Sequence, residues 1–435
     1  TCTDIRCLAL SSFDVTFHGK KAHAAIMPEE GRSAFDALLL AFQGVEFLRE
    51  HVRDDVRMHY TVKTLPGPEN VVPSEAVGSF ALRSFSRDYL DQVAERFRDI
   101  VRGAALMAGV TCEIAEKPAL ANKVPNLTLN DLRNAPAVPY EEDEVTRIIQ
   151  DDVNETIFRE FRNMTVAEFR EWLLDGNTTS EMIRRVSRGL TAEMIAAVAK
   201  LMSNLDLIYA AKKIQVTAHC NTTIGLPGTF SSRLQPNHTT DDPKGILASA
   251  MEGFSYGCGD AVLGLNPVDD GVESVARILK LFDEFKNKWE VPTQICVLAH
   301  VTTQTEAVRK FNAPIDLMFQ SIAGSQKGNE AFGLDGKLIE EARQLALREG
   351  TATGPNVMYF ETGQGSELSS EAHHGADQVV MEARCYGFAK RFQPFLVNTV
   401  VGFIGPEYLY NSKQVIRAGL EDHFMGKLTG IPMGC

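Results

Sequence analysis

Short apolar runs, each ending in polar or glycine residues and each followed by a stretch of helical periodicity, recur from residue 215 to the end of the chain. Six runs are complete, at residues 229–235, 260–266, 294–300, 317–321, 357–361 and 395–403, and a seventh begins near residues 431–435. Strands that alternate with helices favour parallel pairing, because parallel neighbours need a crossover connection. The pattern predicts an α/β fold, with a (β/α)8 TIM-type barrel as the leading candidate.

The residues that close these runs are the first candidates for function. In a barrel of parallel strands the active site lies at the carboxyl ends of the strands, so polar side chains there are expected to face it. The candidates are Arg233, Gln235, Asn266, His300, Gln320, Ser321 and Glu361.

Three of these side chains suggest a specific chemistry. Arg233 and Gln235 alternate with Leu234 and so point to one side of their strand, where they could bind a small hydroxylated or aminated molecule. Glu361 ends an apolar run and precedes a glycine-rich turn, where a carboxylate could bind an ammonium group or transfer protons. A purely structural role stays open, with Glu361 capping the turn and the other two in an internal polar network.

The first part of the chain follows a different pattern. Strand periodicity at residues 12–18, 57–65, 76–84 and 110–115 and helical periodicity at 31–52 and 87–107 give the order βαββαβ, a ferredoxin-like α+β domain. Residues 118–139 are rich in Pro and Asn and predict a linker, followed by a helix at 166–175 with Thr165 as its N-cap and another from Thr191 to about Lys213. We therefore expect three parts, at residues 1–118, 119–213 and 214–435.

Composition narrows the possible partners and the compartment. The 435 residues carry a formal net charge of −13, which disfavours nucleic acid or an anionic membrane as a partner. The eight cysteines form no C-x-x-C pair, as is typical of a reducing compartment. Without a membrane-length apolar run or a signal peptide, the protein is expected to be cytoplasmic, and its initial Thr suggests a fragment.

Histidines offer an alternative chemistry. His373 and His374, with Glu371 and Asp377, resemble a metal-binding group, but adjacent histidines on a helix diverge by about 100°, so we expect no metal site there. The H-E-x-x-H, G-x-G-x-x-G and Walker patterns are absent. His23 follows the first predicted strand, and its spacing alone indicates no more than a solvated loop histidine.

Six segments, at residues 140–152, 223–228, 232–237, 319–324, 359–366 and 397–410, closely resemble the large subunit of ethanolamine ammonia-lyase, and the likeness covers about residues 128–435. The resemblance implies a barrel enzyme that uses adenosylcobalamin to convert ethanolamine to acetaldehyde and ammonia by radical chemistry. It also implies a small partner subunit that helps enclose the cofactor, a homo-oligomer of large subunits, and a location in the cytoplasm or in a bacterial microcompartment.

The matching motifs carry residue roles with them. The substrate-binding set implied by the resemblance is Arg233, Leu234, Gln235, Asn266, Glu361 and Val400. Glu361 and Gln235 would face the amino group, Arg233 and Asn266 would face the hydroxyl group, and Arg233, Gln235 and Glu361 would form the catalytic set. The implied cobalamin-binding set is Pro267, Gln320, Ser321, Phe332 and Ser369.

The chain departs from this family in two places. A family glutamate just before the position of Phe332 is replaced by Ala331, with Glu330 one place earlier. The family has a substrate-binding Asp directly after the residue that matches Cys435, so one ligand of the amino group is missing. Because only six strands are complete, we also expect an incomplete barrel, whose activity is in doubt.

Residues 1–125 resemble an unrelated family, the dimerisation or lid domain of zinc-dependent amidohydrolases and peptidases of the aminobenzoyl-glutamate hydrolase type. Residues 17–25 and 68–73 carry the likeness, which implies that His23 stabilises an oxyanion in a neighbouring active site with the help of Asn70. Because the zinc-binding domain of such enzymes has no counterpart here, the leading hypothesis is a lyase joined to a lid domain. The alternatives are a zinc amidohydrolase fragment and a catalytically inactive fusion.

Overall fold

The computed structural model describes residues 9–64, 67–84, 86–117, 124–362, 372–399 and 412–434. Contacts within the chain divide it into two compact units, Thr1–Asn126 and Leu127–Cys435. In the part of the chain described, no helix combines the length and the apolar composition that a membrane crossing needs.

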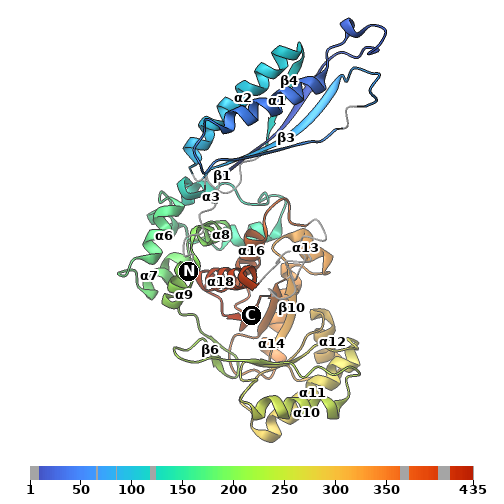
Figure 1. Ribbon diagram of the computed structural model, residues 1–435. Coiled ribbons are helices and arrows are strands. Elements are labelled where there is room, and N and C mark those ends of the chain that lie inside the picture. The colour runs from blue at the N-terminus through green and yellow to red at the C-terminus, as the bar shows by residue number, and fades with distance from the viewer. Residues whose placement is uncertain are drawn as a thin grey trace. The chain divides into compact units, whose positions relative to one another are not determined.

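The first unit has the predicted βαββαβ order. Its elements are β1 (Ala9–His18), a 3-10 helix (Pro28–Glu30), α1 (Ala34–Arg49), β2 (Arg57–Val62), β3 (Glu75–Ser84), α2 (Arg87–Ala108), β4 (Thr111–Glu116) and a second 3-10 helix (Val124–Asn126). The four strands form one antiparallel sheet in the order β2-β3-β1-β4. Figure 1 shows α1 and α2 together on one face of this sheet.

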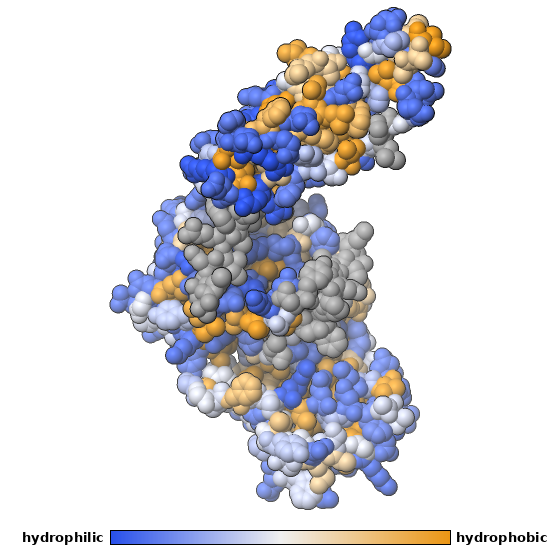
Figure 2. Space-filling view, viewed as in Figure 1, coloured by the Kyte–Doolittle hydropathy of each residue, from blue (hydrophilic) through white to orange (hydrophobic). Residues whose placement is uncertain are grey.

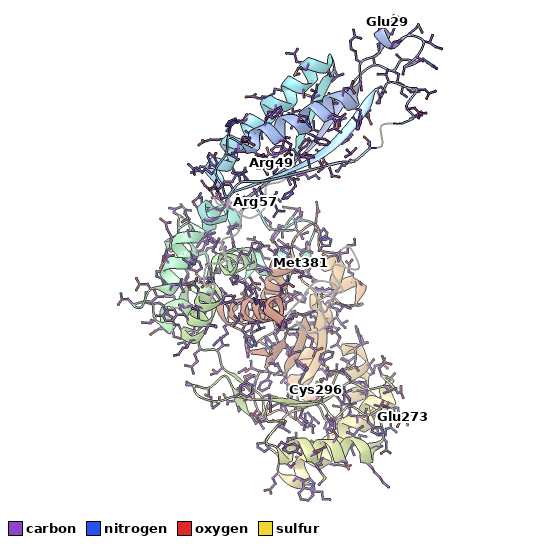
Figure 3. The ribbon with its side chains drawn as sticks, in the orientation of Figure 1. Glu29, Arg49, Arg57, Glu273, Cys296 and Met381 are labelled. Atoms are coloured by element: carbon purple, nitrogen blue, oxygen red, sulfur yellow. The ribbon has the colours of Figure 1, made fainter. Side chains whose placement is uncertain are left out.

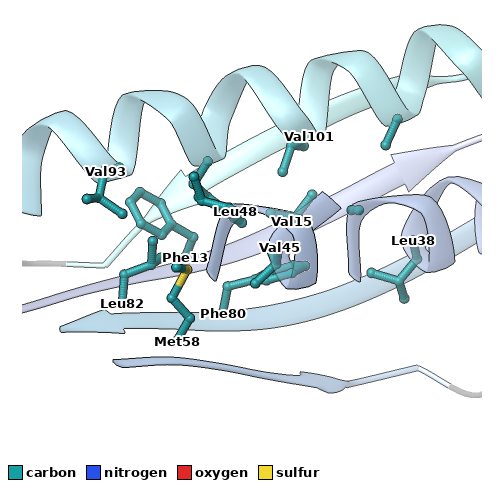
Figure 4. Packing of buried hydrophobic residues seen from close by; sticks show 14 of the residues in the cluster. Phe13, Val15, Leu38, Val45, Leu48, Met58, Phe80, Leu82, Val93 and Val101 are labelled. Carbon is teal, nitrogen blue, oxygen red and sulfur yellow. The ribbon is translucent and has the colours of Figure 1, made fainter. Parts of the chain in front are cut away.

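The core of the first unit lies between the helices and the sheet. Every second residue of β1 is buried, including Phe17. Phe13 and Val15 of β1 lie in one apolar cluster with Leu38 of α1 (Figure 4). The rings of Phe13 and Phe97 of α2 have their centroids 5.0 Å apart. The inward side chains of the strands, at every second position, and the apolar faces of α1 and α2 therefore pack into one apolar layer. This is the arrangement that the sequence pattern predicts.

The opposite face of β1 carries an ionic cluster. Asp14 Oδ2 lies 2.6 Å from Lys63 Nζ, and Asp14 Oδ1 lies 3.1 Å from Lys117 Nζ. Partial burial opposes ionisation of Asp14, but the hydrogen bonds from the two lysines outweigh it and lower its pKa to about 2. This carboxylate thus stays charged over the whole physiological pH range.

The second unit begins with helices. They are α3 (Leu129–Arg133), α4 (Glu144–Asp151), α5 (Glu155–Phe161), α6 (Val166–Leu174), α7 (Ser180–Ser187), α8 (Ala192–Leu201) and α9 (Asn204–Lys213). Thr165 caps α6 as predicted, and Glu168 completes a capping box.

The single helix predicted from Thr191 to Lys213 is wrong, because the structure has two helices there, α8 and α9. Ser203 Oγ accepts a hydrogen bond from the amide of Asp206, whose carboxylate accepts one from the amide of Ser203. This capping box starts a new helix in the middle of an otherwise continuous helical pattern.

Parallel strands overlap all seven of the predicted runs. They are β7 (Arg233–Leu234), β8 (Val262–Leu265), β9 (Ile295–Val297), β10 (Met318–Ile322), β11 (Met358–Thr362), β12 (Leu396–Asn398) and β13 (Met433–Gly434). They pair in chain order as β7-β8-β9 and β10-β11-β12-β13. A hydrogen bond of 3.2 Å from the amide of Leu317 to the carbonyl of Ile295 joins the two sheets, so the mixed α/β prediction is confirmed, whereas closure into a barrel stays a prediction.

Helices connect these strands, and a short hairpin precedes them. The helices are α10 (Pro243–Ser255), α11 (Val272–Trp289), α12 (Val301–Phe311), α13 (Gln326–Ala331), α14 (Gly336–Glu349), α16 (Gln378–Lys390) and α18 (Ser412–Thr429). The hairpin, β5 (Ala218–His219) with β6 (Thr223–Ile224), was not predicted, and Ile224 packs with Cys296, Phe319 and Tyr359 of the parallel strands.

A buried ionic network links the leading helices to the strands. Arg384 of α16 is fully buried and donates hydrogen bonds to Glu193 Oε1 at 2.8 Å, Asp143 Oδ2 at 2.7 Å and the carbonyl of Gly324 at 2.7 Å. Glu193 belongs to α8, Asp143 caps α4, and Gly324 follows β10. Helices α8, α16 and α18 also pack against one another (Figure 1).

The surface gives little further information about partners. On the face shown in Figure 2, apolar side chains are interspersed with polar ones over both units. The described cysteines are free thiols; Cys220, Cys296 and Cys385 are buried, and Cys112 and Cys258 are partly exposed.

Candidate functional site

The carboxyl ends of three neighbouring strands place polar residues side by side. Ser321 of β10 pairs in register with Glu361 of β11, which pairs with Asn398 of β12. Residues in register on parallel strands project from the same face. Two positions earlier the same face carries Phe319 and Tyr359, so an apolar layer lies beneath a polar rim.

Glu361 is the centre of a polar cluster on this face. Its Oε1 accepts hydrogen bonds from Arg233 Nη1 at 2.6 Å, from the hydroxyl of Tyr359 at 2.7 Å and from Asn398 Nδ2 at 3.3 Å. Arg233 Nη1 also donates to the hydroxyl of Tyr359. Because β7 and β11 are not neighbours in a sheet, the Arg233–Glu361 ion pair spans the inner face between them.

Tyr359 and Asn398 were not among the site residues expected from the sequence. Tyr359 lies two residues before Glu361 on the same strand, so strand alternation places both on one face and could have identified it. Asn398 is a polar residue inside an apolar run, which is a weaker signal. The pairing of Asn398 with Glu361 depends on the register between β11 and β12, which the sequence does not reveal.

The other predicted substrate-binding residues are placed less closely around Glu361. Leu234 faces away from the cluster, since its side chain fills the space in front of Gly253 of α10 and Gly259. Gln235 is half-buried one position beyond β7. Asn266 is exposed just after β8, where its backbone N–H donates to Asn237 Oδ1 at 2.9 Å.

Of the predicted cobalamin-binding residues, Gln320 and Ser321 lie on opposite faces of β10, and Pro267 and Phe332 lie in loops. Gln320 lies on the outer face of β10, where its Oε1 accepts from the amide of Val301 at 2.9 Å and its Nε2 donates to the carbonyl of Ser321 at 3.0 Å. Ser321 and Pro267 are half-buried, and Ser321 lies on the inner face. Phe332 follows α13, and its carbonyl makes a 2.9 Å hydrogen bond with His300 Nε2.

His300 is therefore an N-cap residue in this structure. Its Nδ1 accepts from the amide of Thr302 at 3.3 Å, which leaves the proton on Nε2 for the carbonyl of Phe332. Both ring nitrogens serve to join the start of α12 to the end of α13.

Two predicted site residues, Val400 and Ser369, lie outside the described residues, as does Glu371. Asp377 caps α16 and forms an ion pair with Lys200, and His373 Nδ1 accepts from the amide of Gly375 at 3.1 Å. Within the described ranges, no three His, Cys, Asp or Glu side chains come together as a metal-binding group.

Cys296 lies on β9, inside the second unit (Figure 3), and packs in the apolar layer with Phe319 and Tyr359 beneath Glu361. Burial raises the pKa of its thiol well above the usual range, and the carboxylate of Glu361 raises it further. Because the thiolate is the reactive form, this thiol is inert at neutral pH.

In the first unit, the structure brings His23 and Asn70 near each other. His23 forms an isolated bridge with Val71, and the amide of Ala24 donates to the carbonyl of Asn70 at 3.0 Å. These contacts join two loops that are distant in sequence.

Comparison with known proteins identifies the second unit. Residues 93–435 match the family described as "Ethanolamine ammonia lyase large subunit (EutB)". The large subunit of ethanolamine ammonia-lyase from Escherichia coli (strain K12) is 54% identical over 336 residues, which cover 77% of this chain and 74% of the relative. The chain belongs to the ethanolamine ammonia-lyase large-subunit family. Members of this family are carbon–nitrogen lyases, so the enzyme class expected from the sequence is confirmed.

The first unit matches a second family. Residues 9–106 match the family described as "Peptidase dimerisation domain", which overlaps the lyase match at residues 93–106 within α2. A p-aminobenzoyl-glutamate hydrolase chain of Escherichia coli (strain K12) is 36% identical over 116 residues, 26% of this chain and 24% of that relative. A crystal structure of the aminobenzoyl-glutamate utilization protein from Klebsiella pneumoniae gives a TM-score of 0.23 at 32% identity, over 26% of this chain and 28% of that one. The match to the hydrolase chain thus spans about a quarter of that relative's length.

Proposed function

We propose that the second unit converts ethanolamine to acetaldehyde and ammonia, with adenosylcobalamin as cofactor and the small subunit of the family as partner. The observation that carries the proposal is the Arg233–Glu361 cluster, which lies at the carboxyl ends of parallel strands in a chain that is 54% identical to a large subunit of ethanolamine ammonia-lyase. A guanidinium beside a carboxylate suits a ligand that has a hydroxyl group and an ammonium group on adjacent carbons.

We further propose that the parallel strands belong to a (β/α)8 barrel. The strands pair in chain order within two sheets, β7-β8-β9 and β10-β11-β12-β13, and helices lie between successive strands, which supports this architecture. The inward layer of Phe319, Tyr359 and Cys296 below the polar rim is the packing that a barrel interior requires.

Each residue of the rim then has a role. The carboxylate of Glu361 and the amide of Gln235 would bind the ammonium group, and Arg233 and Asn266 would bind the hydroxyl group. Leu234, whose side chain faces α10, would contribute only through its backbone. Val400, outside the described residues, would shape the pocket.

Among the described residues of the predicted cofactor site, three offer groups that a large planar ligand could contact and one does not. Ser321 offers a half-buried hydroxyl on the inner face, and Phe332 and Pro267 offer half-buried apolar surface. The amide of Gln320 is already engaged by backbone groups, so it would fix the end of β10 rather than contact the cofactor directly. Ser369 completes the proposed set. Bound adenosylcobalamin would supply radical chemistry through its cobalt–carbon bond, and the chain's own residues would position the substrate and stabilise charge.

For the first unit we propose a role in association between copies of the chain, as the name of its matching family suggests. This is consistent with the homo-oligomer expected from the sequence. A cytoplasmic or microcompartment location stays a prediction.

The lyase proposal is tested by measuring acetaldehyde formation from ethanolamine by the full chain with adenosylcobalamin and the small subunit. We expect Glu361→Gln to lower kcat/KM at least about 100-fold, because the charge that binds the ammonium group is lost. The matched control is Glu306→Gln, which removes a carboxylate from a surface pair with Lys310 on α12 and should leave kcat/KM within about twofold. Folded chain without acetaldehyde production would refute the proposal, and stoichiometric zinc would favour the amidohydrolase alternative.

A further inference from the structure

We propose that Tyr359 and Asn398 are positioning residues for Glu361, which hold its Oε1 and so leave Oε2 to receive a primary ammonium group. The choice of ligand rests on the proposed function. The assignment of the two oxygens rests on the geometry alone.

The two oxygens of Glu361 are not equivalent. Oε1 accepts three hydrogen bonds, from Arg233, Tyr359 and Asn398, which come from three different strands. A carboxylate oxygen has about two lone-pair sites, so Oε1 is already saturated. Among the described residues no side chain or backbone group donates to Oε2, so none of them competes with a ligand for this oxygen.

The two positioning residues are themselves held in place. Tyr359 is fully buried, and its ring makes an edge contact with Phe319 at a centroid distance of 5.3 Å. The side chain of Asn398 is fixed by its register with Glu361 and is almost fully buried. Neither group can turn toward water without losing a hydrogen bond in a low-dielectric site.

Exposure separates the positioning residues from the groups that meet the ligand. The side chains of Glu361 and Arg233 are 18% and 24% exposed, whereas Tyr359 is not exposed at all. A ligand can therefore reach the carboxylate and the guanidinium but not the tyrosine hydroxyl. Tyr359 would act through Glu361. Its hydroxyl also accepts from Nη1 of Arg233, but the guanidinium has further N–H donors for a hydroxyl group. Removing the tyrosine hydroxyl should therefore disturb recognition of the ammonium group more than recognition of a hydroxyl group.

Direct binding provides the test, since it does not require turnover. The full chain is titrated with ethylammonium, which has only the amino function, and with ethane-1,2-diol, which has only hydroxyl functions, by ligand-observed NMR. We expect Tyr359→Phe and Asn398→Ala each to weaken ethylammonium binding about tenfold and to change diol binding less than twofold.

The chain offers a matched control. Tyr386 of α16 is another fully buried tyrosine, and its hydroxyl donates to a different carboxylate, Glu382 Oε1, at 2.6 Å. Tyr386→Phe removes the same kind of buried tyrosine–carboxylate hydrogen bond without touching Glu361, and it should leave the binding of both probes within twofold of the unsubstituted chain.

Three results would overturn the inference: equal weakening of both probes, unchanged binding of ethylammonium in the two variants, or no ethylammonium binding by the unsubstituted chain. If Tyr359→Phe fails to fold, as judged by circular dichroism, Asn398→Ala carries the same selective expectation. Selective loss of ethylammonium binding in a chain that forms no acetaldehyde would refute the lyase proposal and support the positioning role, so the two failures are distinguishable.

Discussion

Replacing Arg384 by leucine should destabilise the second unit severely. Arg384 neutralises two carboxylates that are almost wholly buried, those of Asp143 and Glu193, at 1% and 7% side-chain exposure. Removing one partner of a buried ion pair costs about 3–5 kcal/mol, because the remaining charge is left uncompensated. The lost hydrogen bonds to the carbonyl of Gly324 and to Thr146 Oγ1 are part of this cost.

Urea unfolding followed by tryptophan fluorescence measures this effect in the right part of the chain. Both tryptophans, Trp172 and Trp289, lie in the second unit. The matched control is Arg185→Leu, which removes a guanidinium of α7 from an exposed pair with Glu160 of α5 and should cost no more than about 1 kcal/mol.

The loss of stability in Arg384→Leu should depend on pH and on the charges of Asp143 and Glu193. In Arg384→Leu the uncompensated carboxylates favour protonation, so the loss should shrink as the pH falls from 8 toward 5. Adding Asp143→Asn and Glu193→Gln should recover part of the stability, since no buried charge then remains. A loss below about 1 kcal/mol in the single variant at pH 8 would refute the assignment of a buried ionic network.

The remaining predictions concern pH and backbone strain. The pKa of Asp422 is raised well above its usual range by burial and by a neighbouring carboxylate, so ionisation of this group destabilises the folded chain. The free energy of unfolding of Asp422→Asn, measured in urea, should therefore increase relative to that of the unsubstituted chain as the pH rises from 4 to 8. Gly225 has φ of +80° and no room for a Cβ, so Gly225→Ala should cost about 2–4 kcal/mol by thermal unfolding, against about 1 kcal/mol for Gly228→Ala, where φ is +74° and the space is open. The lowered pKa of Asp14 contributes stability that is present above pH 4 and lost as the pH falls through about 2. Asp14→Asn should therefore cost about 1 kcal/mol at pH 7 and progressively less as the pH falls through about 2, as measured by hydrogen exchange of β1 peptides.

Much of the fold was readable from the sequence because the strands carry their own signals. Apolar runs with polar ends located β7 to β13, and alternation placed Arg233 on the inner face and Leu234 on the outer one. Thr165, as an N-cap, indicated the start of α6. The break before α9 was also readable, since Ser203 and Asp206 have capping-box spacing, but the longer helical periodicity concealed it.

The contacts between residues that are far apart in the sequence could not be predicted. The sequence offered Arg233 and Glu361 as candidates but gave no distance between them, because that distance depends on how β7 and β11 face each other. The sequence made Gln320 and Ser321 equal candidates for the site. In the structure Gln320 faces α12, whereas Ser321 faces the inner polar rim. The roles of Tyr359 and Asn398 depend on register and burial, which are properties of the folded chain.

The three donors on Glu361 Oε1 have a consequence for metal ions. Calcium and similar hard cations are held best when a carboxylate offers both oxygens or when several carboxylates converge. Here one oxygen is occupied by scaffold groups and a guanidinium adds positive charge beside it. The site should therefore discriminate against the abundant inorganic cations of a cell and favour a cation that can donate a directed hydrogen bond.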